Sequence, residues 1–62
     1  MHPIPAAVEI ERIGGRLLVR SIADGGIIRM HGFDLWVDAE SFAESERLRL
    51  NVEKVVRREE GS

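Results

Sequence analysis

The sequence predicts an all-β domain, in which a four-stranded antiparallel meander and a fifth strand close a small barrel of the SH3 or OB type. Two observations support this fold class. Short runs of alternating apolar and polar residues are separated by glycine-containing dipeptides, as expected for hairpins. A further alternating run, Arg47–Glu53, follows in the last third of the chain and supplies the fifth strand.

Three dipeptides mark the predicted turns: Gly14-Gly15, Asp24-Gly25 and His31-Gly32. Two-residue hairpin turns need positive φ at their central positions, which glycine adopts without steric cost. Histidine tolerates positive φ better than most residues, so the third dipeptide is read as a turn as well. The predicted meander therefore extends from Val8 to Val37.

A two-residue turn fixes the register of its hairpin, and the three registers agree on one buried face. They place Ile10 opposite Val19, Ile22 opposite Ile27, and Ile28 opposite Leu35. The buried face then carries an almost unbroken apolar set: Val8, Ile10, Leu17, Val19, Ile28, Met30, Phe33, Leu35 and Val37.

The segment after Val37 allows two interpretations. Ser41 and Glu44 fit a capping box, which predicts a helical turn over residues 39–46 before the fifth strand. The adjacent β-branched residues Val55 and Val56 also favour a strand. Alternatively, a helix continues to about Glu60, and the fold is α+β, a four-stranded meander covered by one C-terminal helix.

Length and composition predict a single domain over residues 1–62, with an extended start over 1–7 and a frayed tail over 57–62. A core this small supplies little net stability, and without cysteine no disulfide adds to it, so self-association is expected. The net charge of −2 is not that of a typical nucleic-acid-binding domain. No apolar run is long enough for a membrane span, and the expected location is the cytoplasm.

The sequence offers no catalytic, cofactor or metal site. His2 and His31 are the only histidines, and neither has an evident partner for acid–base chemistry. The acidic residues Asp38, Glu40 and Glu44 lack the spacing of a calcium loop. We therefore expect a protein that is not an enzyme and needs no cofactor.

The second face of the predicted sheet carries the candidate binding residues. In the derived registers Ile22, Ile27 and Trp36 form an apolar row, with Leu18 nearby. Such a row is expected to be covered by the C-terminal segment, by a second copy, or by another protein. On the same face the registers place Arg20 opposite Arg29 and Glu9, and Asp34 opposite Arg29, with Arg16 further along the strand of Arg20. This allows either a neutralised ladder of ion pairs or phosphate contacts with Trp36 or His31 stacking.

These features predict a small, non-catalytic interaction module that self-associates and binds another protein. The alternative is a small-barrel nucleic-acid-binding regulator that uses the arginine and tryptophan side chains of the second face. Salt dependence of binding to generic nucleic acid separates the two hypotheses.

Overall fold

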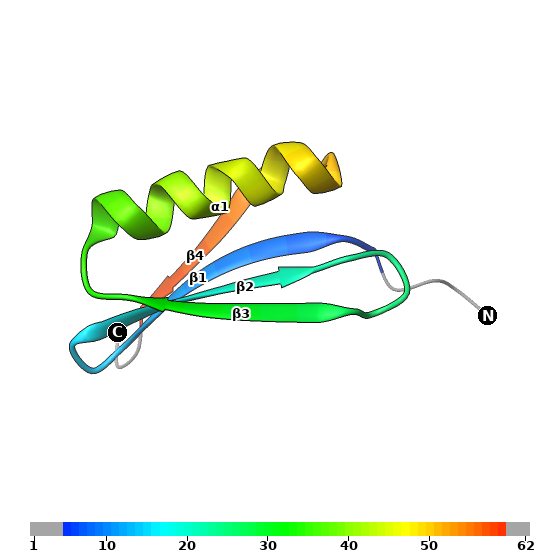
Figure 1. Ribbon diagram of the computed structural model, residues 1–62. Helices are drawn as coiled ribbons and strands as arrows, with labels where there is room; N and C mark the ends of the chain where they lie inside the picture. The colour runs from blue at the N-terminus through cyan, green and yellow to red at the C-terminus, as the bar shows by residue number, and fades with distance from the viewer. Residues whose placement is uncertain (1–4, 60–62) are drawn as a thin grey trace.

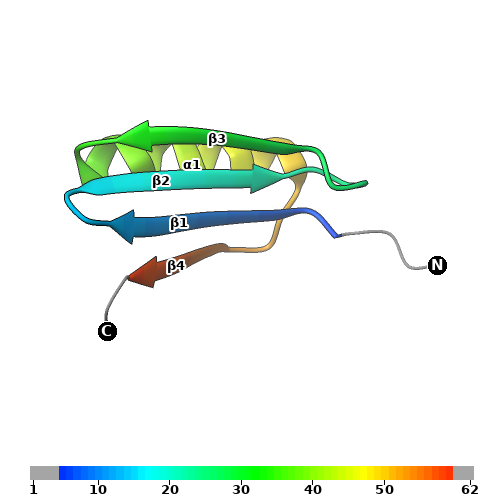
Figure 2. The same cartoon turned by 90° about the horizontal axis from the view of Figure 1, so that it is seen from below.

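The computed structural model describes residues 5–59 and shows an open, mixed four-stranded sheet with a helix on one face (Figure 1). The elements, in chain order, are β1 (Ala7–Ile13), β2 (Arg16–Ile22), β3 (Ile28–Phe33), α1 (Trp36–Leu50) and β4 (Val55–Glu59). The sheet order is β3-β2-β1-β4, and β4 runs parallel to β1 while the other neighbours are antiparallel (Figure 2). The predicted all-β barrel is therefore wrong, because β3 and β4 are opposite edges of an open sheet in an α+β fold.

The first predicted hairpin is confirmed. Gly14 has a positive φ of 61°, but Gly15 does not have a positive φ, so only one of the two central positions has the predicted geometry. The register pairs Ile10 with Val19 and Glu9 with Arg20, as the two-residue turn predicts. Two of the four strands in the sheet thus follow directly from Gly14-Gly15 and the alternation around it.

The second turn is longer than the predicted dipeptide Asp24-Gly25. The β2–β3 loop covers residues 23–27, and both Gly25 and Gly26 have positive φ, at 92° and 91°. The Ala23 N–H donates to the Ile27 carbonyl across the loop at 2.8 Å. Ile22 therefore pairs with Ile28 instead of Ile27. Because side chains alternate along a strand, this shift of one residue exchanges the two faces of β3.

The exchange moves predicted core residues to the surface. Ile28 and Met30 are each 54% exposed on the face away from α1. Arg20 lies opposite Met30, so the predicted pairing of Arg20 with Arg29 is also wrong. Arg29 lies opposite Ser21, on the face that α1 covers.

The third predicted turn is absent. β3 continues through His31 and Gly32 to Phe33, and helix α1 begins at Trp36. An added Cβ at Gly32 would lie 3.1 Å from Nη2 of Arg16, which is the far end of an exposed side chain, so packing does not require glycine there. The predicted fourth strand over residues 33–37 is therefore wrong, and Leu35 and Val37 are exposed rather than buried.

The segment Trp36–Leu50 forms a helix because it contains neither glycine nor proline and is rich in Ala, Glu, Arg and Leu. It starts five residues before Ser41, which lies exposed within the helix, so the capping box is wrong. Glu44 instead binds Arg47 at 2.6 Å. The helix also includes residues 47–50 of the predicted fifth strand, and it ends at Asn51, which has a left-handed φ of 57°.

The strand tendency of Val55 and Val56 is confirmed, because both lie in β4. β4 lies beside β1, as expected for the last strand, but it is parallel and closes no barrel. The expected end segments fall partly on residues 1–4 and 60–62, which lie outside the described residues. Of the rest, Ala7 begins β1 and residues 57–59 belong to β4.

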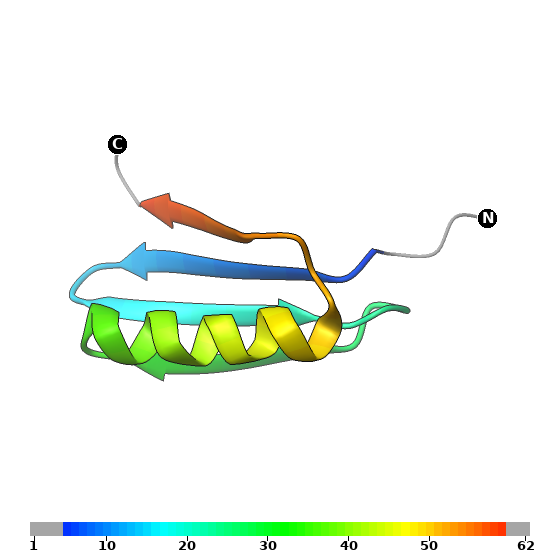
Figure 3. The ribbon, with the colours of Figure 1, turned by 90° about the horizontal axis from the view of Figure 1, so that it is seen from above.

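The core lies between α1 and the sheet, and Figure 3 shows α1 above β2 and β3. The predicted burial of Val8, Ile10, Leu17 and Val19 is confirmed, with exposures of 0–3%. On the helix, the small residues Ala39 and Ala43 are buried against them and allow a close approach. Around this centre lie half-buried residues from several elements, namely Phe33, Trp36, Phe42, Leu50, Val52 and Val55.

Candidate functional site

One face of the sheet has no helix over it, and we call it the open face (Figure 2). It receives every second side chain of each strand, because the residues between them point to the side that α1 covers. Its larger side chains are Glu9, Glu11, Ile13, Arg16, Leu18, Arg20, Ile22, Ile28, Met30, Val56 and Arg58. A half-covered sheet of this kind presents both apolar and charged groups to its surroundings.

A network of charges crosses the open face on β2, β1 and β4. Arg20 Nη1 donates to Oε1 of Glu9 at 3.0 Å, which confirms the predicted Glu9–Arg20 pair. Arg20 also approaches Glu11 at 3.7 Å, and Arg58 reaches the second oxygen of Glu9 at 3.5 Å. The Glu9 side chain is only 16% exposed. The network therefore neutralises itself within the sheet.

Apolar side chains gather beside this network, at the β3 edge. Ile22 lies opposite Ile28, and Met30 lies two residues further along β3 on the same face. We call these three residues the β3 patch. Ile27, in the preceding loop, is 68% exposed and extends the apolar character of this corner. At the other side of the open face, Ile13 is also exposed.

The residues predicted to bind a partner do not form one site. Arg16, Leu18, Arg20 and Ile22 alternate along β2 and lie together on the open face. The other three are elsewhere: the loop holds Ile27, the covered face holds Arg29, and the start of α1 holds Trp36.

Trp36 belongs to the covered side of the sheet. Its ring is half buried against the core, and the Arg12 guanidinium lies 5.3 Å from the ring centroid. The predicted row of Ile22, Ile27 and Trp36 is therefore wrong. The exposed residues Ile28 and Met30 were missed because the shorter turn assigned them to the core, although Gly25-Gly26 is a sequence signal for a longer loop.

A second cluster lies between α1 and β2, on the covered side. The buried Ser21 hydroxyl donates to Oε1 of Glu46 at 2.9 Å, and Arg49 donates to both Glu46 oxygens at 2.7 and 2.9 Å. The bonds from Arg49, and to a smaller extent the bond from Ser21, together lower the pKa of Glu46 to about 2, against the opposing effect of burial. A carboxylate this acidic is a weak base, and its partners are structural. We assign the cluster to fastening the helix to the sheet.

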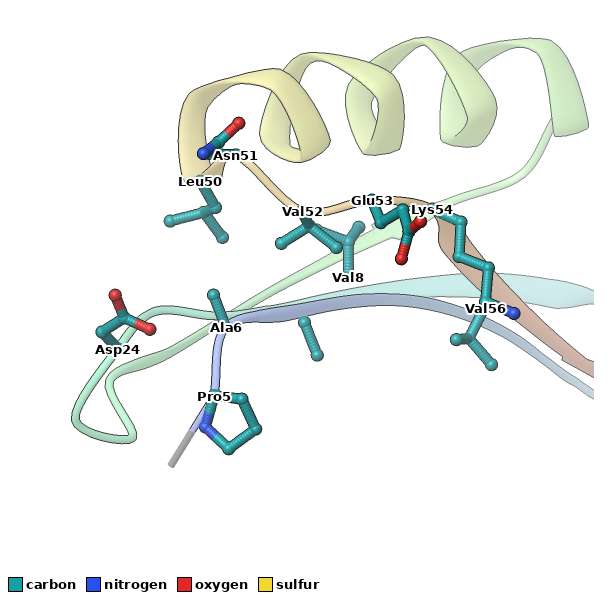
Figure 4. Close-up of a pocket in the computed structure, with 11 residues that line it drawn as sticks. Pro5, Ala6, Val8, Asp24, Leu50, Asn51, Val52, Glu53, Lys54 and Val56 are labelled. Atoms are coloured by element: carbon teal, nitrogen blue, oxygen red, sulfur yellow. The ribbon is translucent and has the colours of Figure 1, made fainter. Parts of the chain in front are cut away.

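The structure also has a shallow pocket of about 570 Å³ beside the start of β1 (Figure 4). It lies between the segment Pro5–Val8 and the connection from α1 to β4. Its charged lining residues are Asp24 at one end and the sequence neighbours Glu53 and Lys54 at the other. Glu53 and Lys54 are both exposed, and we assign no chemistry to this pocket.

Within residues 5–59, no group of three or more His, Asp or Glu side chains could hold a metal ion. None of the helices in this range is long and apolar enough to cross a membrane. Comparison with known proteins gives no match: no family model matches the chain, and no curated protein or solved structure does. Interpretation of function therefore rests on the surfaces of the molecule.

Proposed function

We propose that this chain is a non-enzymatic interaction module that binds another protein through the open face of its sheet and self-associates. The observation that carries the proposal is the apolar content of that face, where Ile28 and Met30 are each 54% exposed. Burial of one large apolar side chain contributes about 1.5–3 kcal/mol, so a partner gains appreciably by covering several of them. The proposal includes a cytoplasmic location.

The chemistry of the open face indicates the kind of partner. The β3 patch offers apolar contacts, while the network of Glu9, Glu11, Arg20 and Arg58 beside it offers polar contacts and resists burial without partners. A fitting partner places apolar side chains against β3 and hydrogen-bonding groups over the network. Such a mixed apolar and polar surface is typical of interfaces between separately folded proteins.

We do not extend the proposal to nucleic acids, because the arginines of this face already have carboxylate partners. Arg20 and Arg58 bind Glu9, and Arg16 lies 3.7 Å from Asp34. Trp36, which was expected to stack on bases, lies on the covered side. A phosphate backbone would have to compete with each of these pairs.

The test compares the immobilised protein with variants of the open face away from β3, namely Ile13→Asp and Val56→Lys. Val37→Asp is the matched control, because Val37 is 69% exposed on α1, which covers the opposite face. We expect a cellular protein that binds the wild type and the control, and binds both open-face variants at least about tenfold more weakly in titrations with the purified partner. Equal binding by all four proteins contradicts the proposal.

A further inference from the structure

The two edges of the sheet differ in how they are protected. β4 carries Arg57, Arg58 and Glu59, and charged side chains are a common means of keeping an edge strand from pairing with another chain. β3 contains no proline or lysine, and Arg29 is its only charged residue. Its residues 28–32 are all exposed. Among the described residues, no strand pairs with the outer edge of β3.

We infer that β3 pairs with β3 of a second copy of this chain, antiparallel, about a two-fold axis normal to the sheet. The two four-stranded sheets then form one continuous sheet, with both helices on one face and both open faces on the other. This inference specifies the self-association in the proposed function. It rests on the edge strand, however, so its failure leaves partner binding by the open face untouched.

The obvious alternative, packing two open faces against each other, is disfavoured by charge. It would bury the network of Glu9, Glu11, Arg20 and Arg58 in both copies. Removing ions from water is unfavourable unless new partners compensate. Pairing along β3 leaves this network in water and satisfies backbone groups that the edge otherwise exposes.

The sequence of β3 favours one register. A two-fold axis normal to the sheet places residues of the same face opposite each other, so three central registers are available. One register puts Arg29 opposite Arg29 of the second copy, and the two like charges repel each other. Another register puts the apolar Ile28 opposite the charged Asp34, which is an unfavourable pair. The third centres the axis on Met30 and places Arg29 opposite His31 and Ile28 opposite Gly32. We therefore assign the third register.

The helices support the same arrangement. Phe42 contacts the rings of His31 and Phe33 at centroid distances of 4.5 and 5.5 Å, so its side of α1 faces β3. Asp38 and Arg49 lie four residues before and seven after Phe42, on that same side. In the two-fold arrangement the helices are antiparallel, and Asp38 near the start of one approaches Arg49 near the end of the other. Opposite charges therefore meet at both ends of the helix pair.

The first experiment measures the mass of the full chain by sedimentation equilibrium over a range of concentrations. We expect a dimer, with twice the 7.0 kDa mass of one chain. Hydrogen exchange provides a second measurement, because all amides of β3 become protected in the dimer while those at the outer edge of β4 stay unprotected. A chain that remains monomeric at millimolar concentration, or β3 amides that exchange as fast as those of an open edge, overturns the inference.

Changes of charge at Arg29 and His31, which both lie on the covered face of β3, test the register without changing the open face. His31→Arg places like charges opposite each other at two symmetric positions, and we expect the dimer to dissociate about 2- to 30-fold more readily. Adding Arg29→Glu to this variant creates two opposite-charge pairs and restores dimerisation. His31→Gln is the neutral control and keeps the wild-type affinity. A double variant that dimerises no better than His31→Arg overturns the register.

A dimer that responds to Ile13→Asp and Val56→Lys but not to the changes of charge at Arg29 and His31 indicates face-to-face packing and also overturns the inference. So does a different protein, rather than a second copy, found paired with β3. Circular dichroism of every variant checks that it keeps the wild-type fold.

Discussion

The Ser21 hydroxyl donates a 2.9 Å hydrogen bond to Oε1 of Glu46, and this buried bond joins β2 to α1. Glu46 is 5% exposed and is fastened from its other side by Arg49. A carboxylate in such a position favours folding only while it is ionised. The pair therefore makes the attachment of the helix dependent on pH.

We expect Glu46→Gln to lower the free energy of unfolding at pH 7 by about 1–3 kcal/mol, because charged hydrogen bonds are replaced by weaker ones. The pKa of Glu46 is lowered to about 2 in the folded state from an ordinary 4.5. Its ionic contribution is thus complete above about pH 4.5 and is lost as the pH falls toward 2. Urea unfolding of the wild type and Glu46→Gln should therefore show a difference in the free energy of unfolding that becomes smaller as the pH is lowered.

Glu44→Gln is the control for this titration, since Glu44 binds Arg47 on the exposed side of the same helix. Its effect at pH 7 should be well below that of Glu46→Gln, because exposed ion pairs contribute little. If Glu46→Gln lowers the free energy of unfolding by the same amount from pH 7 to pH 2, the charge of Glu46 plays no part.

Truncation of apolar residues tests which face of β3 is buried. We expect Ile10→Ala to cost about 2–5 kcal/mol in the free energy of unfolding, because Ile10 is fully buried. Met30→Ala should cost less than about 1 kcal/mol in the monomer, because Met30 is 54% exposed. Denaturant unfolding at low protein concentration measures both. Similar large losses in the two variants would restore the register in which Met30 belongs to the core.

Two glycines with open space around them form a matched pair for the turn geometry. A Cβ at Gly25 or at Gly15 meets nothing within 4 Å, but only Gly25 of these two has a positive φ, at 92°. Gly25→Ala should therefore cost about 1–2 kcal/mol through backbone strain. Gly15→Ala should be neutral or stabilise by up to about 1 kcal/mol. Thermal unfolding compares them, and equal midpoints would contradict the loop geometry.

The sequence predicts the parts of the fold that local patterns determine. Gly14-Gly15 and the alternation around it are sufficient for the β1–β2 hairpin and its four core residues. Val55 and Val56 are sufficient to indicate a strand. The buried residues of the sheet could therefore be predicted from the sequences of β1 and β2 alone.

The register of β3 and the extent of α1 depend on features that local sequence patterns do not reveal. A second glycine at position 26 lengthens one loop, and a shift of one residue then exchanges the faces of β3. The predicted helical turn over residues 39–46 lies within α1, but the full extent of the helix was missed because its most buried residues are Ala39, Ala43 and the charged Glu46, which form no apolar stripe. For the same reasons, the open-face residues of β2 were placed correctly beside one another, whereas Ile28 and Met30 were not anticipated there.

The parallel pairing of β1 with β4 has a consequence for how the chain reaches its folded state. Val8 pairs with Val55, so β1 and β4 can meet only after β2, β3 and α1, which lie between them in the sequence, have been made. Until β4 has been synthesised, β2 is the only sheet neighbour available to β1. Contacts this distant in sequence slow folding, because a large loop must close before they form. We expect the pairing of β1 with β4 to be a late step of folding, so the backbone groups on that edge of β1 stay unpaired until then.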